Sequence, residues 1–254
     1  MRAKKSEHTP VRTICTIEAR MRSTRLPGKV LKPILGRPML ALLIERLQRV
    51  RQVDQIVVAT TDNPIDDPIV ELACQLGTKY FRGSEEDVLD RVLRAARSVN
   101  ADLIVETTGD CPLIDPGVID QLIATFMSNP VDYCANLLSR SYPRGMEAQV
   151  FPVAVLAQVA ELTQDPADRE HVSLYICEHP EQFRLLDIAS GLPPQDADLR
   201  LTVDTQEDFD LVRHVFESLY PINPHFSMSD ILALFKRHPE LRRLNENIQQ
   251  KAVR

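Results

Sequence analysis

Residues 19–29, ARMRSTRLPGK, gather positive charge in a chain whose formal net charge is −6. The stretch contains Arg20, Arg22, Arg25 and Lys29 around a Pro-Gly turn, directly after an apolar run. A sequence pI near 5.6 does not suit the broad basic face of a nucleic-acid-binding protein, so we predict no nucleic-acid partner. Because the positive charge is local, its expected partner is a small anion.

Two aspartates stand where they could hold a metal beside such an anion. Asp110 follows the apolar run DLIVETT, and Asp204 closes the run LRLTVD. Mg²⁺ prefers oxygen ligands, keeps several waters and takes one or two carboxylates from a protein. Cations on one loop and carboxylates at two neighbouring strand ends would together hold a metal-bound triphosphate.

Simpler interpretations of the same residues stay open. Arg-rich loops are often only solvated, and Asp110 and Asp204 could each cap the helix that follows in the sequence. By default, His171 is a partly exposed helix residue, and Cys111 is a small apolar filler without an activating partner. The chain lacks the G-x-x-x-x-G-K-[ST] and G-x-G-x-x-G patterns, which disfavours a P-loop ATPase and a nicotinamide dehydrogenase.

Short apolar runs alternate with longer amphipathic ones, which indicates βαβ units and an α/β fold with a mostly parallel sheet. The first half predicts strands at residues 11–17, 55–60, 79–81 and 102–107, and helices at 40–50, 68–76, 86–99 and 116–127. After residue 129 the pattern predicts strands at 132–136, 148–151 and 199–203, a helix at 169–178, and further helices beyond. Ligands of such sheets bind beyond the carboxyl ends of the strands, where the cationic stretch and both aspartates are expected.

The length suits one large α/β domain, which we place at residues 11–241. Residues 1–10 predict a short disordered lead, and residues 242–254 predict a polar tail. No apolar run is long enough for a membrane span or a signal peptide, so we expect no membrane partner. Five widely spaced cysteines without a C-x-x-C pair indicate reduced thiols and a cytoplasmic protein.

The sugar cytidylyltransferases open with a signature that closely resembles EARMRSTRLPGKVLKPILGRPML of this chain. The SpsF-like branch, known from spore-coat polysaccharide synthesis, has blocks similar to FRGSEEDVLDR, GDCPLIDP, PRGMEAQVF, REHVSLY and LTVDTQEDFDLV in the same order. The resemblance covers about residues 13–216. It implies a Rossmann-like nucleotide-diphospho-sugar transferase fold with helices on both faces of the sheet. A small hairpin-and-helix insertion at about residues 137–190 would serve the acceptor and a homodimer.

The same resemblance implies roles for individual residues. The catalytic residues would be Arg20, Lys29 and Asp110. The cofactor would be Mg²⁺, with Asp110 and Asp204 as its ligands. The nucleotide site would consist of residues from two loops: Ala19, Arg20, Arg25, Lys29, Arg82, Gly83 and Ser84. The acceptor would lie against Arg144, Glu147, Glu170 and His171.

The implied reaction is transfer of CMP from CTP to an acidic sugar or sugar phosphate, with release of pyrophosphate, in surface polysaccharide synthesis. Two positions depart from the family pattern. Arg22 stands where relatives often have a small residue, and Thr108 stands where the sialate and octulosonate enzymes tend to have glutamine. A guanylyltransferase, a glycosyltransferase of related fold and a catalytically idle nucleotide-binding module therefore stay open as alternatives. The single aspartate of GDCP weighs against the glycosyltransferase, because such enzymes typically use an Asp-x-Asp pair.

Overall fold

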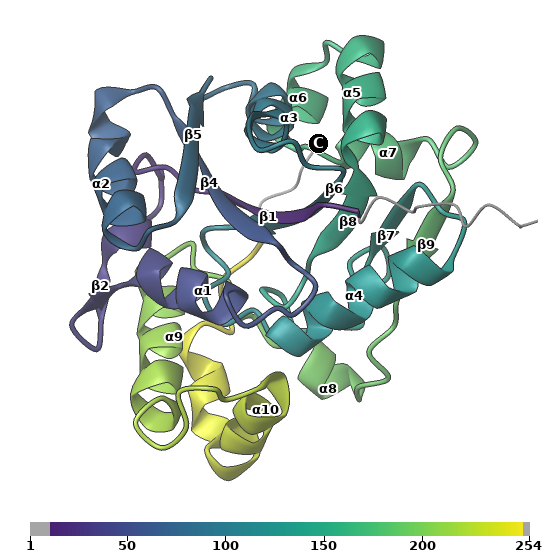
Figure 1. The fold of residues 1–254 in the computed structure, drawn as a ribbon. Coiled ribbons are helices and arrows are strands. Elements are labelled where there is room, and N and C mark those ends of the chain that lie inside the picture. The colour runs from purple at the N-terminus through teal and green to yellow at the C-terminus, as the bar shows by residue number, and fades with distance from the viewer. Residues whose placement is uncertain (1–10, 251–254) are drawn as a thin grey trace, which may run out of the picture.

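A computed structural model describes residues 11–250 of the chain. The lead expected at residues 1–10 and the end of the expected tail, residues 251–254, lie outside this range. The described part is built on a seven-stranded sheet (Figure 1). Its strands, in spatial order, are β5 (Lys79–Gly83), β4 (Gln55–Thr61), β1 (Thr13–Glu18), β6 (Leu103–Thr108), β8 (Gln149–Pro152), β7 (Tyr133–Ala135) and β9 (Leu185–Asp187).

The sheet is mostly parallel, as predicted. Strand β8 runs antiparallel to both of its neighbours, β6 and β7, and the other adjacent strands are parallel. The chain builds β1, β4 and β5 outward in one direction and then places β6 on the other side of β1. The carboxyl ends of β1 and β6 therefore form the point where the strand order reverses, which is the usual ligand-binding position in an open α/β sheet.

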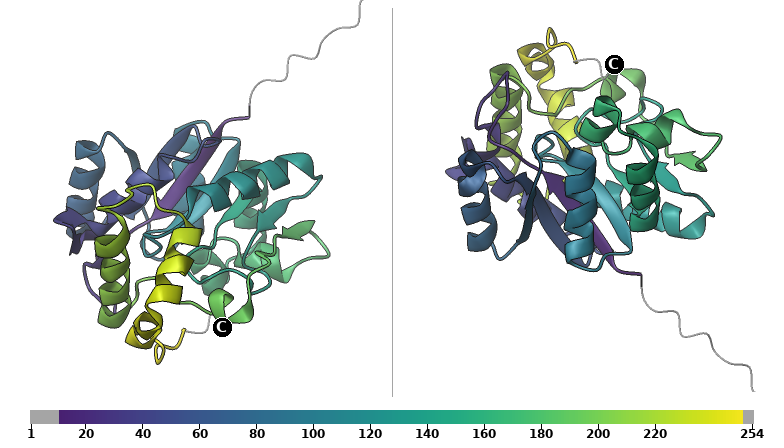
Figure 2. Two further views of the ribbon diagram at one scale, coloured as in Figure 1. Left: turned by 90° about the horizontal axis from the view of Figure 1, so that it is seen from below. Right: turned by 90° about the horizontal axis from the view of Figure 1, so that it is seen from above.

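Helices cover both faces of the sheet, each over its own apolar core (Figures 1 and 2). The core on one face is closed by α1 (Met39–Leu47), α2 (Asp67–Gln75), α4 (Pro116–Ser128), α9 (Gln206–Leu219) and α10 (Met228–Arg237). The opposite face carries α3 (Val88–Ser98), α5 (Val153–Leu162), α6 (Pro166–Glu170) and α7 (Leu174–Glu178). The smaller elements are η1 (Lys29–Leu31), β2 (Pro33–Ile34), β3 (Arg37–Pro38), η2 (Pro64–Asp66), α8 (Pro194–Ala197) and η3 (Pro239–Leu244).

The eight elements predicted in the first half of the chain are all present, with ends that differ by at most three residues. Local capping explains the differences. Helix α3 begins at Val88 rather than at residue 86 because the Asp87 side chain accepts a hydrogen bond from the backbone N–H of Asp90. Strand formation at β7 and β8 is also confirmed, and these two strands pair in antiparallel fashion.

The strand predicted at residues 199–203 is wrong. The segment is buried, but it forms only an isolated bridge between Arg200 and Arg144. Its backbone bonds to the loop before β8: Arg144 N–H donates to the Leu199 carbonyl at 2.9 Å, and Leu201 N–H donates to the Arg144 carbonyl at 2.7 Å. The alternation of apolar residues in this segment therefore indicates which side chains are buried. It does not indicate a strand, because the backbone of the segment bonds to a loop rather than to a sheet edge.

Two further predictions for the second half need correction. The helix expected at residues 169–178 is two short helices, α6 and α7, because the chain turns between Glu170 and Leu174; α5 precedes them and was not predicted. The boundary of the polar tail at residue 242 is also wrong. Asn245 is buried, and the Gln250 side chain accepts a 2.6 Å hydrogen bond from Arg200, so this segment packs onto the domain.

Candidate active site

The cationic stretch becomes a closed loop because both of its ends are anchored. The N–H of Met21 donates to the buried carboxylate of Asp66 at 2.6 Å, which holds the beginning of the loop above β4. Gly28 adopts a left-handed backbone with φ of 69° and donates its N–H to the Met21 carbonyl at 2.8 Å. The reversal at Pro27-Gly28 turns the chain into η1, which starts at Lys29.

Lys29 lies at the centre of the site. Its Nζ is 3.0 Å from Asp110 Oδ2, 3.0 Å from Asp204 Oδ1 and 2.7 Å from the carbonyl oxygen of Val203. The three residues predicted to hold the phosphates and the metal, widely separated in the sequence, therefore meet at one point beyond the carboxyl edge of the sheet. The side chain of Lys29 is 12% exposed, so these are partly buried ion pairs.

The loop after β6 is fastened to the segment that ends at Asp204, and this fastening brings the two aspartates together. The Asp110 carbonyl accepts hydrogen bonds from Val203 N–H at 2.8 Å and from the Thr202 hydroxyl at 3.2 Å. The Thr108 hydroxyl donates to Asp110 Oδ1 at 2.5 Å and fixes the orientation of that carboxylate. Neither aspartate caps a helix, because Asp115 caps α4 and Thr205 caps α9.

The charges of this cluster stabilise each other. Burial opposes the positive charge of Lys29, but attraction to Asp110 and Asp204 outweighs it, so the pKa of Lys29 lies above its ordinary value. Burial likewise acts to raise the pKa of Asp204, yet Lys29, Arg25 and Arg200 together lower it below its usual range. Both groups are therefore ionised at neutral pH.

The two aspartates fit a Mg²⁺ ion. One oxygen of Asp110 and one of Asp204 lie at the same distance from the Lys29 ammonium, so a single cation in this region can reach both. Within residues 11–250, no group of three or more His, Cys, Asp or Glu side chains is arranged to hold a metal without further ligands. Two hard oxygen donors, completed by water and phosphate oxygens, are the set that Mg²⁺ takes at polyphosphate sites.

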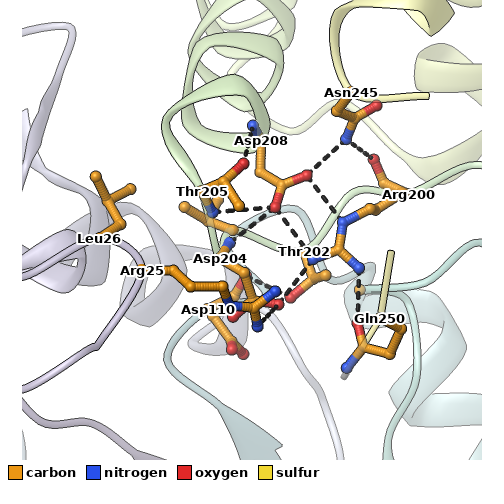
Figure 3. A network of polar contacts seen from close by, with 12 residues as sticks. Arg25, Leu26, Asp110, Arg200, Thr202, Asp204, Thr205, Asp208, Asn245 and Gln250 are labelled. Atoms are coloured by element: carbon orange, nitrogen blue, oxygen red, sulfur yellow. Dashed lines mark hydrogen bonds and ion pairs between the residues drawn. The ribbon is translucent and has the colours of Figure 1, made fainter. Parts of the chain in front are cut away.

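The arginines of the loop are not equivalent. Arg25 Nη2 is 3.0 Å from Asp204 Oδ2, so Arg25 belongs to the cluster around Lys29 (Figure 3). Arg20 and Arg22 instead both face Glu85, at 3.5 Å and 3.4 Å. The side chain of Arg22 is 62% exposed and that of Arg20 is 44% exposed, so Arg22 is the more peripheral of the two. Ala19, at the start of the loop, is buried.

The second predicted nucleotide loop begins at the end of β5. Arg82 donates from Nε to the Thr61 carbonyl at 2.9 Å and from Nη2 to the Asn63 carbonyl at 2.8 Å, and its Nη1 is 2.6 Å from Asp67. These contacts commit Arg82 to holding the chain between β4 and α2. Gly83 and Ser84 follow it at the N-terminal end of α3, where the Ser84 hydroxyl accepts N–H bonds from Glu86 and Asp87. A role of these residues beside the base stays a prediction.

The predicted acceptor residues divide into two pairs. Arg144 and Glu147 flank the crossing of the loop before β8 over residues 199–203, and Gly145 is needed there because a Cβ would lie 2.8 Å from the backbone of Leu201. Burial raises the pKa of Glu147, and the nearby negative charge of Asp110 contributes. Glu170 and His171 are exposed at the end of α6. No contact among the described residues brings this second pair to Lys29.

Sequence reasoning missed several buried charges around the site. Arg200 contacts Asp204 on one side and Asp208 on the other, and Asn245 bonds to both Arg200 and Asp208 (Figure 3). Glu18, at the end of β1, has buried carboxylate oxygens with no hydrogen-bond partner of good geometry among residues 11–250. The signals were present in the sequence, because a charged residue inside an apolar run, as in LRLTVD or TICTIE, must find a partner or change its protonation state when buried.

The fold and the site together define a class of protein. A mostly parallel α/β sheet with a lysine and two carboxylates at its strand-order reversal suits a protein that binds a metal-bound nucleotide at that point. The cytidylyltransferase family pattern matches residues 14–249, so the chain belongs to the cytidylyltransferase family and is an enzyme.

Individual relatives support this assignment. The chain is 34% identical over 230 residues to the spore coat polysaccharide biosynthesis protein SpsF of Bacillus subtilis, covering 88% of this chain and 94% of the relative. A solved cytidylyltransferase of Leptospira borgpetersenii serovar Hardjo-bovis is 32% identical, with a TM-score of 0.87 over 96% of this chain and 100% of that one. The structure of CMP:2-keto-3-deoxy-manno-octonic acid synthetase complexed with CTP has the same fold, with a TM-score of 0.60 at 22% identity, over 82% of this chain and 99% of that chain.

The sequence-based assignment to a sugar cytidylyltransferase of the SpsF-like branch is thereby confirmed. The predicted fold class is confirmed as well. In the described part of the chain, no helix combines the length and the apolar character needed to cross a bilayer. The five cysteines form no disulfide in the described structure.

Proposed function

We propose that this enzyme transfers CMP from CTP to an acidic sugar or sugar phosphate and releases pyrophosphate, in the synthesis of a surface polysaccharide. One observation carries the proposal: Lys29 lies within 3.0 Å of both Asp110 and Asp204 at the strand-order reversal of a cytidylyltransferase. The Bacillus subtilis relative is a spore coat polysaccharide biosynthesis protein, which supports a role in the synthesis of a surface polysaccharide. The octonic acid synthetase bound to CTP supports the nucleotide and the acidic acceptor.

The reaction is an in-line displacement at the α-phosphorus of CTP. A new bond forms between the acceptor oxygen and the α-phosphorus, the bond to the bridging α,β-oxygen breaks, and pyrophosphate leaves with that oxygen and its electron pair. The proton of the acceptor, where the attacking oxygen carries one, goes to solvent or to the leaving group. Such transfers depend on positioning and charge neutralisation more than on covalent participation of the protein.

The chain supplies the charges that this displacement needs. Lys29 and Arg25 now neutralise Asp110 and Asp204, and both can turn to the triphosphate when it binds, with Arg20 at the entrance of the loop. Mg²⁺ would then take the place of Lys29 and Arg25 beside the two aspartates. There it would neutralise charge on the phosphates and orient the reacting oxygens. Lys29, Arg25 and Arg20 then stabilise the departing pyrophosphate.

Arg144 and Glu147 are the residues best placed for the acceptor. Glu147 lies close enough to Asp110 for the two charges to interact, and the guanidinium of Arg144 contributes to the same local field. Arg144 suits the acidic group of the acceptor, and Glu147 suits a sugar hydroxyl. Contacts of Glu170 and His171 with the acceptor, a homodimer formed through residues 137–190, and a cytoplasmic location stay predictions.

A pyrophosphate-release assay tests the function. The wild-type enzyme, Mg²⁺ and each of the four common nucleoside triphosphates are combined with a panel of acidic sugars and sugar phosphates, and CTP should give the fastest turnover. Asp110→Asn and Asp204→Asn should each lower kcat by at least about 100-fold, the scale of losing one preorganised electrostatic group. Asp210→Asn, a change at a partly exposed side chain on α9, is the control.

Three outcomes are informative. Near-normal turnover in both aspartate variants would contradict the metal assignment. A preference for GTP would make the enzyme a guanylyltransferase with the same phosphate site. Absence of pyrophosphate release with every combination, from a protein that still binds CTP, would favour the idle nucleotide-binding module.

A further inference from the structure

A buried charged network lies behind Asp204, and no step of the proposed transfer uses it (Figure 3). Arg200 grips Asp208 through two hydrogen bonds, Nε to Oδ1 at 2.9 Å and Nη2 to Oδ2 at 3.1 Å. The same Nη2 donates to Asp204 Oδ2 at 2.7 Å. The side chains of Arg200 and Asp208 are 8% and 0% exposed, so neither is a surface ion pair. Burying these charges costs free energy, so we asked what the buried ion pairs contribute to the protein.

Arg200 differs from the other two cations that contact Asp204. Lys29 and Arg25 belong to the loop at residues 19–29, and Arg25 is 37% exposed, so it is free to swing toward a ligand. Arg200 is fixed on every side: its guanidinium is held by Asp208, and its carbonyl accepts an N–H bond from the buried Asn245 at 3.0 Å. When the loop cations turn to a triphosphate, Arg200 is the cation that stays with Asp204.

Asp208 also fixes the backbone around Asp204. Its Oδ2 accepts the N–H of Asp204 at 3.0 Å and the N–H of Thr205 at 3.1 Å. One carboxylate therefore holds Asp204 by its main chain directly and by its side chain through Arg200. The Arg200 contact occupies Oδ2 of Asp204, which leaves Oδ1, the oxygen on the side of Lys29 and Asp110, for a metal.

We infer that Asp208 is a positioning residue for the metal-binding carboxylate of Asp204 and acts through Arg200. The inference rests on the proposed function, because it gives Asp204 the metal. Asp208 touches neither nucleotide nor metal; it keeps the Asp204 carboxylate in one orientation while the charges in front of it rearrange. Residues that orient the ligands of a metal typically change metal affinity or activity by about 10- to 100-fold when removed.

The rival explanation is that Asp208 only caps a helix. Thr205 and Asp208 form a capping box at the start of α9, and Ser227 and Asp230 form a second one at the start of α10. The second box contains no arginine: the Asp230 carboxylate bonds to the N–H and hydroxyl of Ser227. A capping box in this chain therefore does not need a buried arginine, and the two boxes provide a matched comparison.

The experiment compares Asp208→Asn with Thr205→Ala and Asp230→Asn. Asparagine keeps the shape of Asp208 but removes the charge and places an amide donor against N–H groups. The rise in melting temperature caused by a fixed CTP concentration is measured against Mg²⁺ concentration, together with the Mg²⁺ dependence of kcat. Asp208→Asn should raise the half-saturating Mg²⁺ concentration about tenfold in both measurements. Thr205→Ala and Asp230→Asn should lower the melting temperature without CTP and leave the Mg²⁺ curve within about twofold of the wild type.

A second variant covers a failure of Asp208→Asn to fold. Asn245→Ala removes the bonds of Asn245 to the Arg200 carbonyl and to Asp208 Oδ1, without changing any charge, and should raise the Mg²⁺ requirement about threefold. An unchanged Mg²⁺ curve in the folded variants, or an equal shift in Thr205→Ala, would overturn the inference while leaving the proposed function intact. A wild-type protein whose stabilisation by CTP does not depend on Mg²⁺ would instead overturn the metal role on which both rest.

Discussion

Two buried charged clusters lie close together at the carboxyl edge of the sheet and are built in opposite ways. In the first, Asp204 is contacted by Lys29, Arg25 and Arg200, and every charge has a partner within 3.0 Å. In the second, Glu18 of β1 lies close to Arg91 of α3 and to Glu106 of β6. Both oxygens of Glu18, Oε2 of Glu106 and Nε of Arg91 are buried, and the described part of the chain offers them no hydrogen-bond partner of good geometry.

The difference determines which carboxyl groups are charged. Partners keep Asp204 ionised despite its burial, as its proposed role as a metal ligand requires. Burial raises the pKa of Glu18 to about 8, and the attraction of Arg91 offsets this only in part. Burial, reinforced by Glu18, also raises the pKa of Glu106 well above its ordinary value. The contacts around each buried carboxylate therefore decide whether that carboxylate is ionised in this protein.

The largest expected effect concerns how the free energy of unfolding changes with pH, and it tests this comparison directly. The ordinary pKa of Glu18 is 4.5 and its folded value is about 8, so between these pH values the folded state retains a proton that the unfolded state has lost. The free energy of unfolding should therefore fall as the pH rises from about 5 to about 8, by up to about 1.36 kcal/mol per pH unit. Glu106 acts in the same direction.

Urea unfolding of the wild type and Glu18→Gln at several pH values measures this effect. The variant should show a clearly shallower loss of stability with rising pH, because glutamine has no proton to lose. Glu161→Gln, an exposed change on α5, should follow the wild-type curve. Parallel curves for the wild type and Glu18→Gln would show that Glu18 finds solvent or a partner and is ionised throughout.

The next effect in size is the loss of Lys29 from the paired cluster. Lys29→Ala should weaken CTP binding by about 1.5–3 kcal/mol, the cost of one charge-assisted contact. Calorimetric titration of CTP in the presence of Mg²⁺ measures the change. Lys32→Ala is the matched control, because it removes a nearby lysine whose Nζ bonds to the side chain of Gln206 rather than to either aspartate. Equal losses in the two variants would mean that only overall positive charge matters.

Much of the first half of the fold could be predicted, because its strands and helices follow local periodicity. Residues 199–203 show where this fails: Leu199, Leu201 and Val203 alternate as in a strand and are buried, yet their segment bonds to the loop around Arg144. Alternation reports which side chains face the core, and the choice of backbone partner depends on segments far away in the sequence. The helix break between α6 and α7 likewise has no periodic signal.

The centre of the site could be predicted, and its support could not. Asp110 follows the end of β6, and Lys29 follows the Pro-Gly turn of the loop after β1, so sheet topology brings these two to one edge. Asp204 reaches them through the hydrogen bonds of Thr202 and Val203 to the Asp110 carbonyl. Asp208 has the sequence position of an ordinary capping residue, and Asn245 falls in what looks like a polar tail. Only the folded chain shows that both meet Arg200.

The smallest effect concerns Arg22, the more exposed of the two arginines that face Glu85, and it tests whether pairing at the surface matters as it does in the buried cluster. Arg22 is 62% exposed and 3.4 Å from Glu85, a type of surface ion pair that is typically worth less than about 1 kcal/mol. Arg22→Ala should therefore change CTP affinity by less than about threefold, and Arg22→Gly, which places a small residue there, should not weaken it. Arg20→Ala should cost about as much as Lys29→Ala, because Arg20 directly follows the buried Ala19 at the end of β1 and leaves Glu85 for the phosphates. Calorimetry under the same conditions measures all three variants. Equal, small losses from Arg20→Ala and Arg22→Ala would show that both arginines form a diffuse positive rim and that the specific contacts begin only at Arg25 and Lys29.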